Sequence, residues 1–447
     1  MSEQRSLLER HRAVMPDWLA LYYDEPISLV RGEGRHVWDA DDNRYLDWFG
    51  GILTTSTAYN LPEVVQAVQA QAAKMLHTST LYLLENQIEL AEEIAALAPV
   101  DNAKVFFCNS GTEANETALM LATNMRRSNQ VLALRNSYHG RSFAAMALTG
   151  NRGWRASSLS PINVSYVHNG YRYRSPFGHM PDEEFSQACA DDLRNVIETT
   201  TSGDVACMIA EPIQGVGGFT VPPDGFFGKM KTVLDEYGIM FISDEVQTGW
   251  GRAGDHFWGI QAHGVRPDIM TFAKGLGNGL AVGGVIASAE VMDCVGANSI
   301  STFGGNPLSM AGSLANLRYI LANNLQQNSC DVGNAIFAHL HVLHAKHALP
   351  IVGEIRGKGL MLGVELCKPH TKDPDPAAAG AVMEATKSRG LLIGKGGLYG
   401  NCLRAAPPMT MTMEEAEEGL DILVASIQHV QKEMHGIEAP VAASVRA

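Results

Sequence analysis

Two short segments that repeat one pattern organise this sequence, IMFISD at residues 239–244 and IMTFAK at residues 269–274. Each begins with a run of apolar residues, which is typical of a short buried strand in a parallel sheet. Each ends on a charged side chain, Asp244 in the first segment and Lys274 in the second. Ligands of open α/β sheets bind in the crevice outside the carboxyl ends of the strands, so we expect both side chains to project into one cleft.

An acid and an amine in one cleft have two interpretations. The first is an ordinary salt bridge, which would offset the cost of burying Asp244. The second is a site for pyridoxal phosphate (PLP), in which the lysine forms a Schiff base with the cofactor and the carboxylate keeps the pyridine nitrogen protonated. Considered without their surroundings, the two residues favour the salt bridge.

The residues around Asp244 reverse this preference. Residues 242–252 read ISDEVQTGWGR and resemble the Asp-Glu-Val-Gln-x-Gly-x-Gly-Arg signature of the class III aminotransferases, which are PLP enzymes of fold type I. Lys274 falls where that family has its PLP lysine, and the resemblance extends over nearly the whole chain. It implies an α/β fold with a large domain, whose mostly parallel seven-stranded sheet lies between helices, and a smaller α+β domain built from both termini. It also implies that Lys274 and Asp244 are the catalytic residues.

A second motif predicts where a phosphate binds. The apolar residues 105–108 precede Asn109-Ser110-Gly111-Thr112, and a helical pattern follows. A strand, a short turn and a helix start form an anion site, because unpaired N–H groups and the helix dipole point at the same place. A simple N-cap by Ser110 or Thr112 explains the pattern equally well. Residues 109–115 also resemble the phosphate cup of the family, which implies that Ser110, Gly111 and Thr112 hold the cofactor phosphate.

The resemblance implies further contacts with the cofactor ring. Tyr138 is expected to lie flat on the pyridine ring, although a single tyrosine is more often a core residue. Val246 is expected on the opposite face, and Gln247 on the ring hydroxyl. His139 is expected beside the cofactor without a catalytic role.

The same resemblance implies a homodimer, or a dimer of dimers, with active sites at the subunit interface. Residues 301–307, STFGGNP, match the Thr-x-x-Gly-Asn-Pro string of the family. In that string the threonine, here Thr302, reaches the phosphate of the neighbouring subunit's cofactor.

Five residues are candidates for binding substrate. Arg404 lies in CLRAAPP at residues 402–408, where the family arginine receives a substrate carboxylate with its planar fork. Glu211, at the end of another apolar run, is expected to neutralise Arg404 when no carboxylate is bound. Arg141 stands where relatives that use 4-aminobutyrate or acylated ornithines carry an arginine for the donor carboxylate; the alternative is a pair with a surface acid. Trp48, or Phe49 beside it, is expected to form an aromatic wall, with packing in the core as the alternative for each, and Ile52 is expected to lie at the mouth of the site.

These assignments predict PLP-dependent transamination by a ping-pong mechanism. The amino group of an ω-amino acid (4-aminobutyrate, β-alanine or ornithine-like) or of alanine would pass to pyruvate, glyoxylate or 2-oxoglutarate. A class III phospho-lyase or a dialkylglycine decarboxylase-like enzyme is the alternative. The chain also departs from the family at residues 58–62, which read AYNLP where the family often has Gly-His-x-His-Pro. A dinucleotide-binding loop at glycines 275, 277 and 279 fails on spacing and context. A PLP-bound regulator without turnover is disfavoured because the catalytic and substrate residues are all present.

Composition limits the partners and the compartment. The formal net charge of −14 argues against binding to nucleic acid, which demands clustered Lys and Arg. No apolar run is long enough to span a bilayer, and no His-Glu-x-x-His or similar spacing predicts a metal site. Seven scattered cysteines without a Cys-x-x-Cys pair, and an N-terminus without the apolar core of a signal peptide, favour the cytoplasm.

A chain of 447 residues exceeds the size at which single cores stop growing, so at least two packed units are expected. The predicted divisions are residues 1–60 for the N-terminal part of the small domain, 61–307 for the large PLP-binding domain, and 308–447 for a linking helix and the C-terminal small domain. Within them we expect a hairpin of two short strands, over residues 32–40 and 44–49, around a turn at 41–43. We also expect two helices over 63–98, an insertion at 151–200 that includes a polar and aromatic surface stretch at 171–178, and a long helical region from about 308 to 342. A last amphipathic helix is expected at 413–434, followed by a disordered tail at 439–447.

Overall fold

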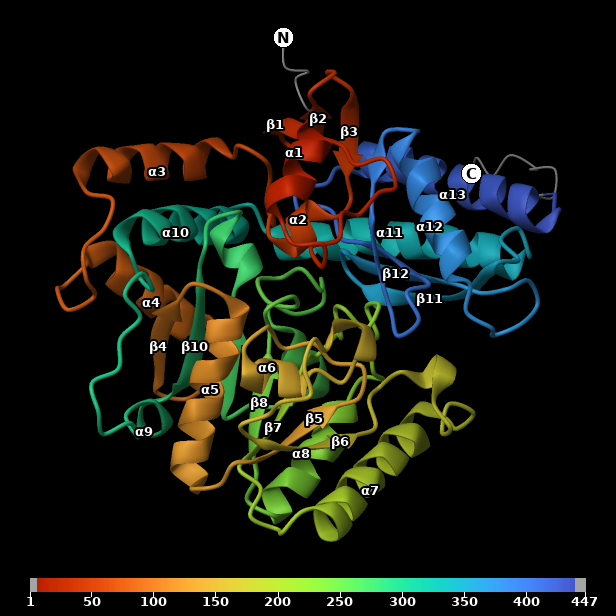
Figure 1. The fold of residues 1–447 in the computed structure, drawn as a ribbon. Coiled ribbons are helices and arrows are strands. Elements are labelled where there is room, and N and C mark those ends of the chain that lie inside the picture. The colour runs from red at the N-terminus through yellow and green to blue at the C-terminus, as the bar shows by residue number, and fades with distance from the viewer. Residues whose placement is uncertain (1–5, 439–447) are drawn as a thin grey trace.

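A seven-stranded sheet forms the centre of the larger part of the protein (Figure 1), seen here in a computed structural model that describes residues 6–438. The strand order is β4-β10-β9-β8-β7-β5-β6. Only β10 runs antiparallel to its neighbours, so the predicted, mostly parallel sheet is confirmed. The strands are β4 (Ala103–Cys108), β5 (Gln130–Leu134), β6 (Asn163–Val167), β7 (Cys207–Ala210), β8 (Met240–Asp244), β9 (Ile269–Phe272) and β10 (Gly283–Ser288).

The central strands position the two charged residues. Every residue of β7, β8 and β9 is buried, which explains their unbroken apolar runs. Asp244 is the last residue of β8 and lies opposite Thr271 of β9, and Lys274 follows the end of β9 by two residues. Both side chains therefore start from the same carboxyl edge of the sheet, as the two segments predict.

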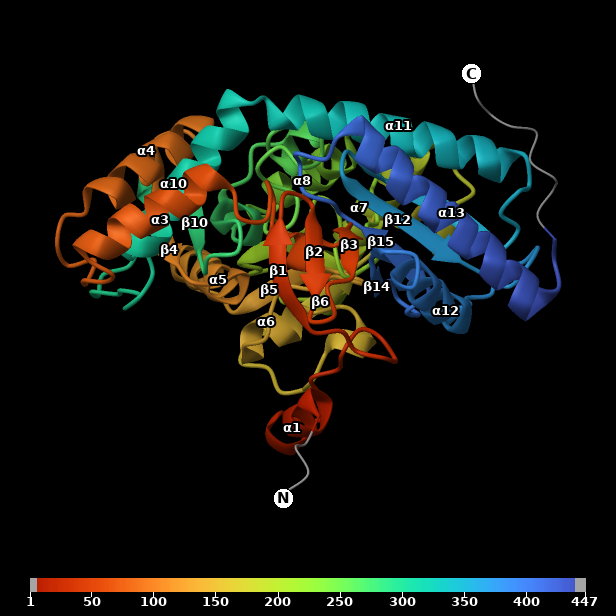
Figure 2. The same cartoon turned by 90° about the horizontal axis from the view of Figure 1, so that it is seen from above.

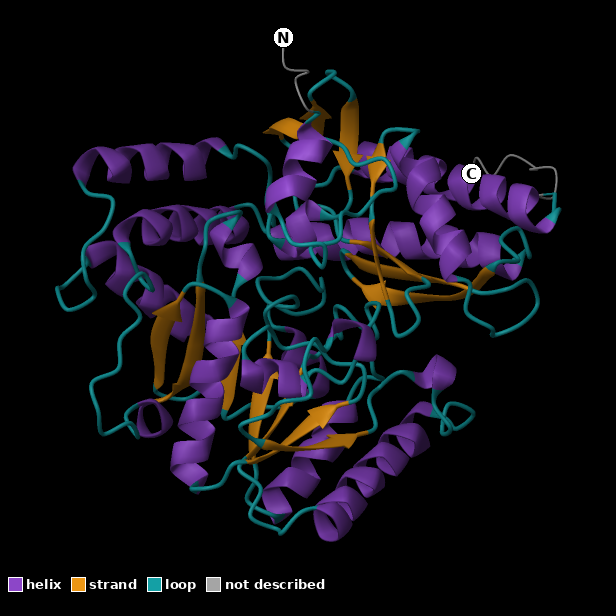
Figure 3. Ribbon diagram, viewed as in Figure 1, coloured by secondary structure: helices purple, strands orange, loops and turns teal. Residues whose placement is uncertain are grey.

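Helices cover both faces of this sheet (Figure 3). On one face, apolar side chains of α5 pack on alternate residues of β5, β7 and β8. On the other face, Phe185 of α7 and Phe226 and Phe227 of α8 pack against Leu132 and Phe241. The helices flanking the sheet are α5 (Gly111–Arg126), α6 (Phe143–Leu148), α7 (Asp182–Thr200), α8 (Phe226–Glu236) and α9 (Ala289–Met292).

Strands from both ends of the chain share one small sheet. The order is β1-β2-β3-β13, and β13 from the C-terminal region pairs in parallel with β3 from the N-terminal region. A second small sheet, β11-β12-β15-β14, carries Arg404 on β15. The strands are β1 (Leu29–Glu33), β2 (His36–Asp39), β3 (Arg44–Asp47), β11 (Val352–Lys358), β12 (Met361–Leu366), β13 (Leu391–Leu392), β14 (Gly394–Gly396) and β15 (Cys402–Ala405). The three predicted domain boundaries stay predictions.

The remaining helices lie around these two sheets and along the large sheet (Figure 2). They are α1 (Leu7–Val14), α2 (Gly50–Leu53), α3 (Pro62–Lys74), α4 (Glu85–Leu97), α10 (Pro307–Ala322), α11 (Leu325–Ala345), α12 (Pro376–Lys387) and α13 (Met413–His435). The two helices predicted over residues 63–98 and the last helix are confirmed. No helix within residues 6–438 is long and apolar enough to cross a membrane.

The predicted hairpin around residues 41–43 is confirmed, because β2 and β3 pair antiparallel on either side of this turn. The helical region predicted at 308–342 is present as α10 and α11, which are separated at Asn324 with φ +49°.

Three local predictions are wrong. The stretch at residues 32–40 is divided between β1 and β2, because the chain turns at Gly34 with φ +60°. Residues 151–200 are not an insertion, because they include β6, an edge strand of the large sheet. Residues 171–178 are not a surface stretch throughout, since Tyr171 is buried and donates to Glu365. The tail at 439–447 lies outside the described residues.

Candidate active site

A cavity of about 180 Å³ lies at the carboxyl edge of the large sheet. It brings together nine of the residues predicted from sequence, together with two that were not singled out, Asn115 and Gly140. The predicted lining residues are Gly111, Thr112, Tyr138, His139, Glu211, Asp244, Val246, Gln247 and Lys274. Residues from four strand ends and the start of one helix therefore converge on one space, which is large enough to hold a small organic ligand.

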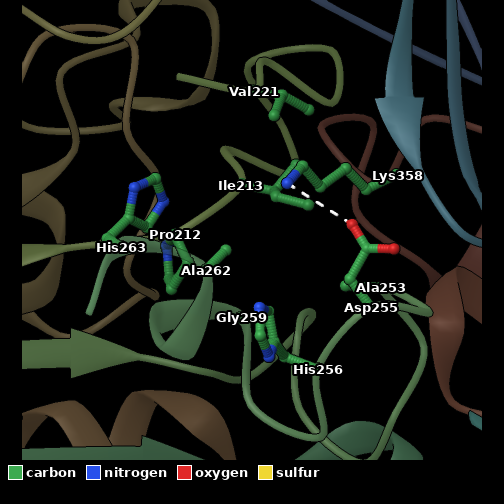
Figure 4. A pocket seen from close by; sticks show the side chains of 10 residues that line it. All are labelled: Pro212, Ile213, Val221, Ala253, Asp255, His256, Gly259, Ala262, His263 and Lys358. Carbon is green, nitrogen blue, oxygen red and sulfur yellow. Dashed lines mark ion pairs between the residues drawn. The ribbon is translucent and has the colours of Figure 1, made fainter. Parts of the chain in front are cut away.

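A neighbouring pocket is too small to compete as a substrate site (Figure 4). Pro212 and Ile213, which follow Glu211 in the chain, line it, and its lining residues Lys358 and Asp255 form an ion pair. Its volume is about 10 Å³, which is room for about one water molecule.

Three donors fix the carboxylate of Asp244. Its Oδ2 accepts from Asn115 Nδ2 at 2.8 Å and lies 2.8 Å from His139 Nδ1, and its Oδ1 accepts from the Val246 backbone N–H at 3.1 Å. Asn115 is held in turn, because its Oδ1 accepts from Thr271 Oγ1 at 2.8 Å. Asn115 is the functional residue that the sequence reasoning missed. The signal was its place at the end of the NSGTEAN motif, one helical turn after Gly111 on α5.

Lys274 lies in a strained turn with φ +42°, a conformation that costs a non-glycine residue about 1–3 kcal/mol. The turn is held from outside. Asn316 Nδ2 donates to the carbonyl oxygens of Gly275 and Leu276, each at 2.9 Å, and Ser56 Oγ donates to that of Gly275. Burial lowers the pKa of the Lys274 amine to about 8, with the positive charge of Arg404 acting in the same direction. The amine is therefore poised between its charged and neutral forms near neutral pH.

The start of α5 provides the predicted anion site. Ser110 caps the helix, since its Oγ accepts from the Glu113 backbone N–H at 3.2 Å, so the N-cap interpretation is correct for this residue. Thr112 Oγ1 accepts from the Arg141 backbone N–H at 3.2 Å. A Cβ at Gly111 would lie 3.0 Å from the Val246 side chain, so glycine suits the close approach of the helix start to the turn after β8. Gly111 and Thr112, in the first turn of the helix, line the cavity, and the unpaired N–H groups of a helix start suit a phosphate.

Glu211 and Arg404 are not paired with each other, contrary to the sequence prediction. The Glu211 carboxylate accepts from the backbone N–H of Tyr138 at 2.9 Å and of Gly215 at 2.8 Å. Burial raises the pKa of Glu211 to about 7. The partners of the Glu211 carboxylate are therefore backbone N–H groups of the two flanking turns and not the guanidinium of Arg404.

The buried Arg404 has partners of another kind. Its Nη2 donates to Gln247 Oε1 at 3.1 Å, so Gln247 bonds Arg404 here. Its guanidinium lies 4.6 Å from the ring centroid of Phe219 and 5.6 Å from that of Phe49, and its Nε has no partner within residues 6–438. An orphaned donor on a buried arginine at the edge of a cavity is the arrangement expected of an anion-binding group without its anion.

Arg141 lies at the exposed rim of the site and does not line the cavity. Within the described residues it forms no ion pair with an acid, so the alternative of a surface salt bridge is not observed. Its guanidinium lies over the ring of Trp18, 5.3 Å from the ring centroid. The arginine is therefore accessible to a carboxylate that enters from solvent.

The two candidates for the aromatic wall, Trp48 and Phe49, face different surroundings. Trp48 is fully buried in the core, where its indole packs so tightly on Gly419 that a Cβ there would overlap it. Its neighbour Phe49 instead faces Arg404. Ile52 is 39% exposed and stands in a left-handed turn formed by residues 50–53, all with φ between +55° and +66°. Such a turn is costly for a β-branched residue. The position of Ile52 at the mouth of the site stays a prediction, since it does not line the cavity.

Thr302 lies apart from the others. It is exposed in the loop between α9 and α10 and does not line the cavity of its own chain. Its predicted role concerns the cofactor of a neighbouring subunit.

The cavity fits PLP. The α5 start suits the phosphate, Tyr138 and Val246 both line the space for the ring, Asp244 offers a carboxylate to the ring nitrogen, and Lys274 offers an amine for the Schiff base. Glycine at position 140 leaves room for the side chain of Thr112, which lines the same cavity, because a Cβ there would lie 2.5 Å from Thr112 Oγ1.

Comparison with known proteins agrees with this arrangement. The family model described as aminotransferase class-III matches residues 21–427. An Arabidopsis thaliana protein named alanine–glyoxylate aminotransferase 2 homolog 2, mitochondrial, is 38% identical over 96% of this chain and 87% of its own length. Acetylornithine aminotransferase of Methanothermobacter thermautotrophicus is 34% identical over 90% of this chain and 94% of its own. The crystal structure of an (S)-enantioselective ω-transaminase from Thermomicrobium roseum superposes with a TM-score of 0.87 at 32% identity, covering 96% of this chain and all of that chain. The chain therefore belongs to the class III aminotransferases.

Proposed function

We propose that this aminotransferase takes the amino group from an ω-amino acid, such as 4-aminobutyrate, β-alanine or an ornithine-like donor, or from alanine, and passes it to pyruvate, glyoxylate or 2-oxoglutarate. The observation that carries the proposal is the presence of two arginines at different depths. Arg404 is buried beside the cavity, and Arg141 is exposed at its rim. A 2-oxo acid carries its carboxylate next to the reacting carbon, whereas an ω-amino acid carries it further away. Two anion positions serve both half-reactions of a ping-pong enzyme.

PLP is the cofactor of class III aminotransferases, and when bound it supplies the electron sink that stabilises negative charge on the donor carbon. The chain supplies the rest. Lys274, once its amine is released by the donor, carries a proton between the donor carbon and the cofactor, a task that suits an amine with a pKa of about 8. Asp244 keeps the ring nitrogen protonated, and its own position is fixed by Asn115 and His139.

Arg404 is suited to the carboxylate of the 2-oxo acid. Its burial is costly unless an anion or a set of dipoles compensates, and Gln247 and two aromatic faces do so in part. An incoming carboxylate can also use the unpartnered Nε.

The test is the donor preference of Arg141→Ala. We expect kcat/KM for 4-aminobutyrate to fall by about 10- to 100-fold, the loss of one charge-assisted pair, while kcat/KM for butan-1-amine, which has a methyl group in place of the carboxylate, changes little. Arg404→Ala is the matched variant and should chiefly impair the half-reaction with the 2-oxo acid. Steady-state kinetics with both donors decide the matter, and equal losses for the two donors in Arg141→Ala would contradict the proposal.

We also propose that the enzyme is a homodimer. The loop between α3 and α4 exposes large apolar side chains, among them Leu83 at 91% exposure, and Phe303 of the loop that carries Thr302 is 60% exposed. The two loops adjoin, since the rings of His77 and Phe303 are 4.9 Å apart. Clusters of exposed apolar residues in a folded chain mark interaction surfaces, and a second copy would bring its Thr302 to this region.

Leu83→Asp should therefore shift the holoenzyme from twice the monomer mass to the monomer mass in light scattering, because it buries a charge in the interface. Leu159→Asp is the control, since Leu159 is similarly exposed but lies in the loop before β6. A wild-type protein that runs as a monomer would rule the homodimer out.

A further inference from the structure

One short N-terminal segment, residues 15–24, reaches both of the arginines discussed above. Trp18 lies under the guanidinium of Arg141 at 5.3 Å. Four residues later, Tyr22 packs edge-on against the ring of Phe49, with ring centroids 5.2 Å apart and planes at 73°. Phe49 in turn lies against the guanidinium of Arg404. Each candidate carboxylate position is therefore in contact, directly or through one ring, with an aromatic residue of the same segment.

The hydrogen bonds between this segment and the rest of the protein lie at its end. Tyr23 donates its hydroxyl to the Ile393 carbonyl oxygen at 3.2 Å, and the Asp24 backbone N–H donates to Glu384 Oε1 at 2.8 Å. Before Tyr23 the chain is poorly packed. Helix α1 has no buried residue and projects from the body of the protein (Figure 2), and Trp18 is 71% exposed. Segments with few buried contacts open at low cost, so Trp18 can leave Arg141 while Tyr23 stays anchored.

We propose that Trp18 is a specificity-determining residue that occupies the face of Arg141 in the free enzyme and is displaced by the carboxylate of the donor. Tyr22 is a positioning residue for the other half-reaction, since it holds Phe49 beneath Arg404. The inference rests on the proposed function, because it takes Arg141 as the site of the donor carboxylate and Arg404 as that of the 2-oxo acid.

The relative strengths of the contacts give the direction of the effect. A cation–π contact at an exposed site is weak, whereas a guanidinium binds a carboxylate through two charge-assisted hydrogen bonds. A carboxylated donor therefore displaces Trp18 from Arg141, but the free energy of the broken cation–π contact is subtracted from its own binding free energy. An amine without a carboxylate leaves the contact in place and loses nothing.

The kinetic test uses the full-length holoenzyme with 4-aminobutyrate, butan-1-amine and pyruvate as substrates. Trp18→Leu should lower KM for 4-aminobutyrate about two- to five-fold, the equivalent of one exposed cation–π contact, and leave KM for butan-1-amine unchanged. Trp18→Phe keeps an aromatic face and should stay close to the wild type. Tyr22→Leu should raise KM for pyruvate several-fold without changing KM for 4-aminobutyrate. Leu19→Ala, in the same segment but without a contact to either arginine, is the control.

A binding measurement separates this inference from the proposed function. Butanoate carries the carboxylate without an amine, so its titration into the holoenzyme should change the fluorescence of Trp18. The change should be absent in Trp18→Phe and in Arg141→Ala. If Arg141→Ala fails to discriminate between 4-aminobutyrate and butan-1-amine, the proposed function is wrong. If it does discriminate, but Trp18→Leu leaves KM unchanged or raises it, or butanoate leaves the fluorescence unchanged, only the role of Trp18 is overturned.

Discussion

Replacing Lys274 with alanine should leave a folded protein that has lost transamination. The amine is the group that bonds the cofactor and then carries the proton, so we expect kcat to fall by at least about 10³-fold, within the range for removal of a positioned acid–base group. Folding should be retained, because the turn around residue 274 is held by Asn316 and Ser56 from outside. Kinetics, thermal unfolding and reduction with borohydride, which fixes a lysine–cofactor bond irreversibly, measure the three properties separately.

Lys274→Arg is the matched control, because it keeps the positive charge but forms no Schiff base. It should be as inactive as the alanine variant. The wild-type protein freed of cofactor adds a pH test. Only the neutral amine attacks PLP, and a lowered pKa means that the neutral form becomes dominant above about pH 8. The rate of PLP capture should therefore rise with pH and level off near pH 8. A rate that climbs to pH 10, as for an ordinary lysine, or a borohydride-fixed cofactor at full yield in Lys274→Ala, would remove Lys274 from this role.

The strands that carry the site were predictable because their residues are buried on both faces. Such strands read as unbroken apolar runs, as in IMFISD and IMTFAK, and each run ends where its charged residue begins. The edge strand β6 was missed for the opposite reason. Its residues, NVSYV, are mostly only partly buried, so they leave a weak pattern that also suits a loop. The turn that separates β1 from β2 depends on a single glycine, Gly34, in a stretch that otherwise reads as one strand.

The candidate site divides in the same way. Residues within short motifs, such as Gly111, Tyr138 and Val246, converge on the cavity because a motif fixes both identity and local geometry. Contacts between segments that are distant in the chain produce no recognisable pattern in the local sequence. Sequence alone does not show which of two adjacent aromatic residues faces inward, since successive side chains of an extended chain point to opposite sides. In the structure, Trp48 packs in the core and Phe49 faces Arg404.

The partner of Glu211 was missed for a related reason. The expected ion pair with Arg404 followed from the resemblance to the family. The structure gives the carboxylate two backbone N–H groups from flanking turns, and their positions depend on the whole fold.

Asp244→Asn should keep the cofactor and lose most of the activity. The phosphate and Schiff-base contacts remain, but a neutral amide cannot hold the ring nitrogen protonated, so the electron sink is weakened. We expect kcat to fall by about 10²- to 10³-fold, the range for loss of one preorganised electrostatic partner. The side chain itself should stay in place. Its amide oxygen can still accept from Asn115 and His139, while its NH₂ group turns toward the single Val246 N–H, at a cost of about one hydrogen bond.

Asn115→Ala separates the charge of Asp244 from its orientation. This variant removes the hydrogen bond to Oδ2 but keeps the carboxylate. Its kcat should therefore fall less than that of Asp244→Asn, by about ten-fold or less, which corresponds to one neutral hydrogen bond. The ring nitrogen of ¹⁵N-labelled PLP reports protonation directly by NMR. It should be protonated in the wild type and in Asn115→Ala, and unprotonated in Asp244→Asn. Because both variants disturb the same cluster, a merely structural role for Asp244 would give them similar losses and the same nitrogen signal. Near-normal turnover of Asp244→Asn, or a ring nitrogen that stays protonated in it, would show that another group protonates the ring.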